Sequence, residues 1–150
     1  MSPPLQDLLR RPRAVSEWIP EVHSHAVLLA QYDQRFTALP EFAAHCYAAQ
    51  RRLWDSKIYA FMMRLMSPVR LLASTSQRWG QFHRGTELVA ERSGEGAAWL
   101  RLTTPPHVYD EIALIGLTEG LRAVIDCSGI SSEFTLVEFD EVGARWAVRW

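Results

Sequence analysis

The spacing of apolar residues changes near residue 86 of this 150-residue chain. Before this point, apolar side chains recur every three or four residues, which is typical of helices that bury one face. After it, they alternate with polar side chains, which is typical of strands with one buried face. The sequence therefore predicts an α+β fold in which N-terminal helices pack on an antiparallel sheet.

A β-hairpin is predicted directly after the change in spacing. Leu88 and Ala90 alternate with glutamates, and alternation resumes through Leu100 and Leu102. The run Arg92–Gly96 between them contains the residue types that favour turns. This pattern indicates two antiparallel strands joined by a short loop.

The rest of the C-terminal half predicts one helix followed by two more strands. We expect the helix to span 104–125 and to begin at a Thr104 cap. Strands follow over 133–139 and 144–150, on either side of a turn. The predicted sheet is therefore four-stranded and antiparallel with one inserted helix, in the order β-β-α-β-β.

The N-terminal half predicts a helix over 23–39 and a longer one over 40–66. One apolar stripe of the long helix comprises Ala43, Tyr47, Trp54, Ile58, Phe61 and Leu65. A second stripe, confined to its C-terminal end, comprises Tyr59, Met62, Met63 and Met66. One stripe faces the core, so the second meets more core, a ligand or another subunit.

A capped helix is predicted between the two halves. Ser67 is a favourable N-cap residue, and Pro68 suits the first helical position. The helix carries Trp79 and Phe82, and Gly85 is a plausible stop.

Composition limits the classes of partner. The net charge of −1 provides no field for a nucleic-acid backbone or an anionic membrane, and no apolar run is long enough to span a bilayer. Cys46 and Cys127 are the only cysteines, and Cys46 lies in an apolar helical stretch, so we expect two reduced thiols in a cytoplasmic protein. We expect one domain, 1–150, with an N-terminal arm (1–20), a helical half (21–84) and a sheet half (85–150).

No residue pattern predicts catalysis or metal binding. His23 and His25 would share a side only on a strand, and no further ligand lies nearby in sequence. His45 and Cys46 are adjacent, so on a helix they point about 100° apart. Cys127 follows a helix C-terminus, which opposes thiolate formation. The expected site therefore has no catalytic residue and no metal, and the protein is not an enzyme.

A set of Gly, Pro and Trp positions recurs in a known layout: Ser67-Pro68, Trp79, Gly85, the helix after Pro106 with Gly116 and Gly120, and Val148-Arg149-Trp150. In these positions the chain resembles the haem-nitric-oxide-binding and 4-vinyl-reductase-like sensor domains. The layout over residues 40–150 is similar as well, most of all to an uncharacterised myxobacterial paralogous family. The resemblance implies a small-molecule site between the helices and the sheet.

The same resemblance argues against haem. It implies a proximal histidine on a helix before the first strand and a Tyr-x-Ser-x-Arg set near the hairpin. The stretch 57–66 has no histidine, and 97–106 has no such set. Relatives of the reductase type carry a cysteine pair around the last hairpin, and here only Cys127 stands near such a position. We therefore expect no cofactor.

These observations predict a non-enzymatic sensor domain that binds a small apolar ligand. The expected lining residues are Trp54, Tyr59, Phe61, Met62, Leu65, Trp79 and Leu100, with His83 or Arg84 as polar contact. One alternative is a protein-interaction or dimerisation module without a ligand, in which the second stripe or an exposed strand edge meets another chain, for example in a homodimer. Another is a reductase-associated or haem-type protein.

Overall fold

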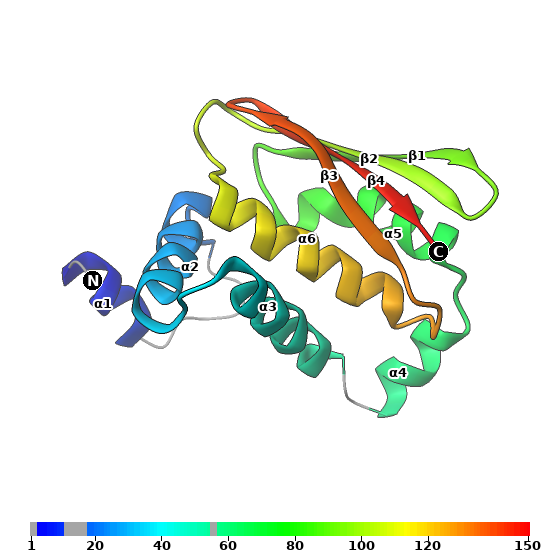
Figure 1. Cartoon of the computed structure of the whole chain (residues 1–150), viewed down its shortest axis with the longest axis horizontal. Helices are drawn as coiled ribbons and strands as arrows, with labels where there is room; N and C mark the ends of the chain where they lie inside the picture. The colour runs from blue at the N-terminus through cyan, green and yellow to red at the C-terminus, as the bar shows by residue number, and fades with distance from the viewer. Residues whose placement is uncertain (1–2, 11–17, 55–56) are drawn as a thin grey trace.

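The computed structural model of the chain describes residues 3–10, 18–54 and 57–150 (Figure 1). Its elements, in chain order, are α1 (Pro3–Arg10), α2 (Glu21–Arg35), α3 (Leu39–Leu53), α4 (Lys57–Arg64), α5 (Pro68–Phe82), β1 (Glu87–Gly94), β2 (Ala97–Thr103), α6 (Glu111–Asp126), β3 (Glu133–Asp140) and β4 (Gly143–Arg149). The predicted α+β class and the order β-β-α-β-β are confirmed.

The sheet is antiparallel throughout and has the strand order β1-β2-β4-β3. The buried side chains of the sheet are concentrated on its two central strands, β2 and β4. Leu100 of β2 lies opposite Trp146 of β4, and Trp146 lies opposite Leu136 of β3. The register of both edge strands shifts once, in β1 between Arg92 and Gly94 and in β3 between Leu136 and Glu138. Such bulges twist an edge and limit pairing with other chains.

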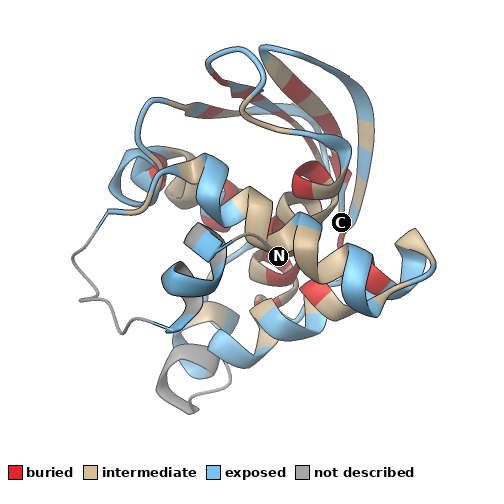
Figure 2. Cartoon of the chain, turned by 90° about the vertical axis from the view of Figure 1, so that its left-hand side faces the viewer, coloured by how far each residue is buried: buried red, intermediate tan, exposed pale blue. Residues whose placement is uncertain are grey.

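Helices α5 and α6 cover one face of the sheet, and α2 and α3 pack against α6 from its far side (Figure 1). The core therefore lies between the sheet and helices α5 and α6, as the buried residues in Figure 2 show. It comprises Leu71, Leu72, Trp79, Leu88, Ala98, Leu100, Leu102, Leu114, Leu121, Ile125, Ala144, Trp146 and Val148.

The predicted helix over 40–66 is wrong as a single element. The structure divides it into α3, which ends at Leu53, and α4, which begins at Lys57. Arg51 and Arg52 lie in the last turn of α3, where cations interact favourably with the helix dipole. The apolar stripe continues across the break and so conceals it.

The inserted helix begins at Glu111, later than the predicted 104. The Asp110 side chain caps it by accepting a hydrogen bond from the Ala113 N–H (2.8 Å). Thr104 instead donates its own N–H to the Val142 carbonyl, which holds the loop against the β3–β4 turn.

The predicted cap of α5 is confirmed. The Ser67 hydroxyl oxygen accepts a hydrogen bond from the Arg70 N–H (3.4 Å), and Pro68 is the first helical residue. Among the described residues, no helix is both long and apolar enough to cross a bilayer.

Candidate functional site

A hydrogen-bonded cluster around Glu21 joins three parts of the chain that are distant in sequence. Glu21 is the first residue of α2, directly after Pro20. Its Oε1 accepts hydrogen bonds from the Tyr109 hydroxyl (2.5 Å) and from His83 Nδ1 (2.7 Å). These partners lie 88 and 62 residues away in sequence. Glu21 therefore ties the start of α2 to the end of α5 and to the loop before α6.

The partners of Glu21 are themselves held in place. The His83 ring stacks on Trp79, with centroids 3.8 Å apart and planes 9° from parallel. Trp79 in turn donates its Nε1–H to the Thr86 hydroxyl oxygen (2.9 Å). On the other side, the rings of His25 and Tyr109 are in contact, with centroids 4.3 Å apart. Each group that faces Glu21 thus has little rotational freedom.

The charge of Glu21 is stabilised by this cluster. Burial alone would raise its pKa, but the hydrogen bonds from His83 and Tyr109, together with the two nearby histidines, lower it below the ordinary value of 4.5. Burial and the contact with Glu21 raise the pKa of Tyr109, so its hydroxyl remains a donor. The carboxylate is the acceptor that both donors require.

We expect Glu21→Gln to lower the free energy of unfolding at neutral pH by about 1–3 kcal/mol, because charge-assisted hydrogen bonds are lost. A lowered folded-state pKa contributes stability above the unfolded pKa, and this contribution is lost as pH falls through the folded pKa. The difference between wild type and variant should therefore shrink below pH 4.5. Urea unfolding at neutral and acid pH measures it. The exposed Glu91→Gln is the control, and an equal, pH-independent loss in both variants would contradict the prediction.

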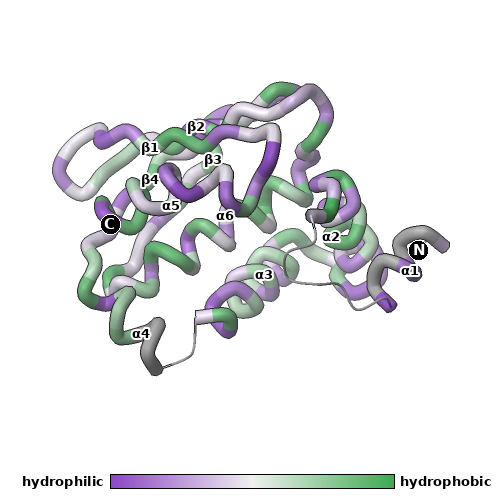
Figure 3. The backbone as a smooth tube through the Cα atoms, turned by 180° about the vertical axis from the view of Figure 1, so that it is seen from behind, coloured by the Kyte–Doolittle hydropathy of each residue, from purple (hydrophilic) through white to green (hydrophobic). Residues whose placement is uncertain are grey.

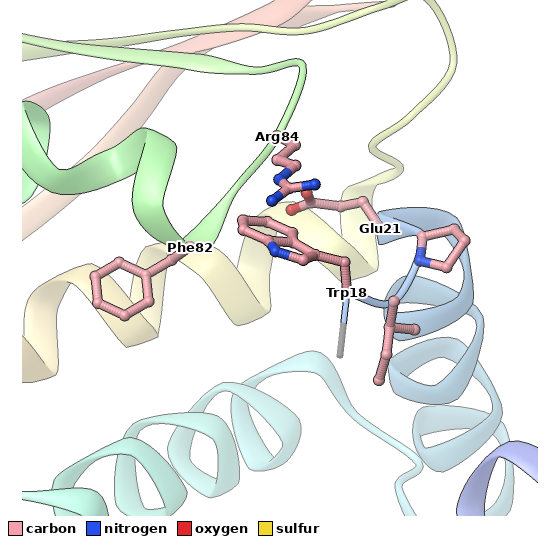
Figure 4. A pocket seen from close by; sticks show the side chains of 6 residues that line it. Trp18, Glu21, Phe82 and Arg84 are labelled. Carbon is pink, nitrogen blue, oxygen red and sulfur yellow. The ribbon is translucent and has the colours of Figure 1, made fainter. Parts of the chain in front are cut away.

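A cavity of about 270 Å³ opens beside this cluster, between the start of α2 and the end of α5 (Figure 4). Its lining residues are Trp18, Ile19, Pro20, Glu21, Phe82 and Arg84. The Arg84 guanidinium carbon lies 3.7 Å from the centroid of the Trp18 ring, in a cation–π contact. The cavity thus combines aromatic surface with one cation and one anion.

The residues predicted to line a site do not come together in one place. Trp79 and Leu100 are buried in the core, and Trp54 is half-buried at the end of α3. Phe61, Met62 and Leu65 are exposed on or just after α4. Tyr59 lies in α4, but its side chain is outside the described residues.

Of the two predicted polar contacts, Arg84 lines the cavity and His83 lies directly behind it, bonded to Glu21. Trp18, Glu21 and Tyr109 were not predicted as site residues. No local pattern could have indicated them, because their role depends on contacts across more than sixty residues.

A second polar cluster lies between α3 and α6. The Tyr47 hydroxyl donates to Asp126 Oδ2 (2.8 Å), and Ser132 donates its N–H and hydroxyl to Asp126 Oδ1 (2.8 and 2.6 Å). Burial raises the pKa of the neighbouring Cys46 thiol to about 11, and the charge of Glu119 adds to this effect. A protonated, buried thiol is a poor nucleophile, so this cluster serves packing.

Metal-binding groups do not converge either. In α2 the His25 Nδ1 is hydrogen-bonded to the Val108 carbonyl (2.9 Å), and His23 lies two helical positions away. Within the part of the chain that the structure describes, no three His, Cys, Asp or Glu side chains are grouped as metal ligands.

Comparison with known proteins identifies the fold. A scan against protein families and a search of curated proteins give no match. Among solved structures, one from a study of haem distortion in the H-NOX family aligns with 93% of this chain and 77% of its own, at 9% identity and a TM-score of 0.64. Another, from work on haem redox potential and porphyrin distortion, aligns with 93% and 81%, at 14% identity and a TM-score of 0.55.

The chain therefore has a fold of the class in which a helical layer covers one face of a small antiparallel sheet. More specifically, its fold is haem-nitric-oxide-binding-like, or H-NOX-like, which confirms the resemblance in layout. At these identities, the likeness extends to the fold alone.

The residues present do not suit haem. The two helices before β1, α4 and α5, contain no histidine. The space between α5, α6 and the sheet is filled by Trp79, Leu100 and Trp146, each at most 5% exposed. The described cavity beside Glu21 lies outside this space, and none of its lining residues is a histidine or cysteine.

Proposed function

We propose that this chain is a non-enzymatic sensor domain that binds a small ligand in the cavity between α2 and α5. The observation that carries the proposal is the position of Arg84, which lies over Trp18 in the same cavity as Glu21 and Phe82. An H-NOX-like fold supports a sensor role. Because buried side chains fill the space between α5, α6 and the sheet, we place the ligand in this cavity instead.

The lining selects the chemistry of the ligand. Trp18 and Phe82 offer apolar surface, and Arg84 offers N–H donors for an acceptor such as a carboxylate or carbonyl oxygen. A volume of about 270 Å³ suits a molecule with one aromatic ring rather than a macrocycle. The ligand is thus a small, largely apolar molecule with one polar edge.

Glu21 connects this cavity to the rest of the fold. Its carboxylate lines the cavity and also accepts the hydrogen bonds of His83 and Tyr109. A ligand that contacts Glu21 would change the strength of these bonds and so the packing of α2 on α5. We propose this change in packing as the route by which binding is communicated.

Ligand-observed NMR with a library of single-ring aromatic carboxylates and amides tests the proposal. Binding should be weakened about tenfold or more by Arg84→Gln, the loss of one charge-assisted contact. Arg78→Gln, a change at an exposed position of α5, should leave it unchanged. The proposal fails if no library member binds, or if binding is insensitive to Arg84→Gln.

A further inference from the structure

A group of apolar side chains is exposed on and just after α4. Phe61, Met62 and Leu65 have 64%, 57% and 69% of their surface exposed. Phe61 and Leu65 are four residues apart, and Met62 is adjacent, so the three lie on neighbouring faces. We call these three residues the α4 surface. Figure 3 shows α4 at the margin of the molecule, away from the sheet.

The opposite side of this segment is anchored. Met63 and Met66 pack against the buried core cluster. The segment is therefore apolar on two sides, although only one side meets the core. Large apolar side chains that stay in water forgo the favourable free energy of burial. Such a helix is typical of a surface that another chain covers.

Charge is strongly segregated along the sequence that contains this surface. Residues 42–86 contain a single acidic residue, Asp55, and seven cations, whereas the rest of the chain has nine cations and sixteen acids. The seven are Arg51, Arg52, Lys57, Arg64, Arg70, Arg78 and Arg84. Arg64 is an exposed residue of α4 itself, and Arg70 is an exposed residue in the first turn of the next helix, α5. Neither forms a salt bridge with any described residue. The net charge of −1 conceals this division.

We propose that the α4 surface binds an acidic amphipathic helix of a partner protein. Apolar side chains of the partner would cover Phe61, Met62 and Leu65, and its flanking carboxylates would pair with Arg64 and Arg70. A short helix with apolar residues four apart packs well against a second helix. The cationic flank specifies the partner's charge.

Two other occupants fit less well. A second copy related by a two-fold axis would bring the cationic flanks of the two copies close together, and like charges repel. An anionic bilayer would attract the flank, but it would repel the remainder of the chain, in which acids outnumber cations by sixteen to nine. An acidic helix matches the local charge without involving the rest of the molecule.

The test uses the whole chain and a labelled synthetic helix of about five turns, with leucines at positions i, i+4 and i+7 and glutamates on either side. Fluorescence anisotropy should show binding that weakens as salt is raised. Phe61→Ser and Leu65→Ser should each weaken it about tenfold or more, as expected for a central contact. Arg64→Glu should weaken it as well, and a peptide with lysines in place of the glutamates should not bind.

The controls separate this surface from others. Val137→Ser changes an apolar residue on β3 that is 52% exposed, and should leave binding unchanged. Arg101→Glu reverses an exposed charge on β2, outside residues 42–86, and should also leave binding unchanged. The proposal is overturned if the acidic peptide does not bind, if the lysine peptide binds equally well, or if Phe61 governs binding only to anionic phosphatidylserine vesicles.

Discussion

Trp146→Ala is expected to lower the free energy of unfolding by about 3–5 kcal/mol. Trp146 is fully buried at the centre of the sheet, between Leu100 and Leu136 on the neighbouring strands. Its Nε1–H donates to the Thr118 hydroxyl oxygen of α6 (2.8 Å). Alanine would leave a cavity between the sheet and α6 and would remove this hydrogen bond. Because domains are stable by only about 5–15 kcal/mol, the loss is large.

Urea unfolding monitored by circular dichroism measures this loss. Trp99→Ala is the matched control, because Trp99 lies on β2 but is only half-buried, with the Arg145 guanidinium over its ring. Trp99→Ala should lower the free energy of unfolding much less, by at most about 1 kcal/mol. Trp146→Phe should fall between the two, because it keeps most of the volume without the hydrogen bond. Equal losses at Trp146 and Trp99 would show that the centre of the sheet is not the main core.

Gly143→Ala is expected to lower the free energy of unfolding by up to about 3 kcal/mol. Gly143 opens β4, where it lies opposite Thr103 of β2 and Asp140 of β3. A Cβ atom there would overlap the carbonyl oxygen of Leu102. Because this neighbour is backbone in a central strand, it cannot rotate away, and the strands must separate locally.

Gly80→Ala provides the contrast for this prediction. Gly80 lies within α5, and a Cβ atom there would have no heavy atom within 4 Å. Alanine in a helix interior is more favourable than glycine by about 0.5–1 kcal/mol, so this variant should be as stable as the wild type or more so. The melting temperatures of both variants, measured by thermal unfolding, test this contrast. A Gly143→Ala melting temperature equal to that of Gly80→Ala would contradict the contact described at Leu102.

The sheet could be predicted from the sequence because its information is local. Alternation over Leu100 and Leu102 indicates which side chains of one strand are buried, whatever that strand pairs with. The cap of α5 is local too, since Ser67 bonds to a residue three positions along. Local patterns of this kind also gave the strand–strand–helix–strand–strand order.

The errors arose where local patterns agree with two outcomes. Apolar spacing continues through the end of α3, so nothing in it distinguishes one helix from two that pack in different places. Thr104 and Asp110 are both good cap residues, and the choice of Asp110 follows from the bond between Thr104 and the β3–β4 turn. Tertiary contacts decided both cases.

The candidate site was beyond local prediction for the same reason. Arg84 was predicted as a polar contact of the site, but the Trp18 ring over which it lies is 66 residues earlier in the sequence. Glu21 looks like an ordinary acidic residue in the first turn of a helix until His83 and Tyr109 are placed beside it. Only the fold brings these groups together.

The strand order has a consequence for how the chain reaches this fold. Because β4 lies between β2 and β3, the first hairpin and β3 have no ladder in common until residues 143–149 are in place. During synthesis the central strand β2 must therefore wait for a partner strand that is made only after α6. Pairings over such sequence separations are slow to form. The stage most exposed to aggregation is thus the interval before β4 emerges from the ribosome.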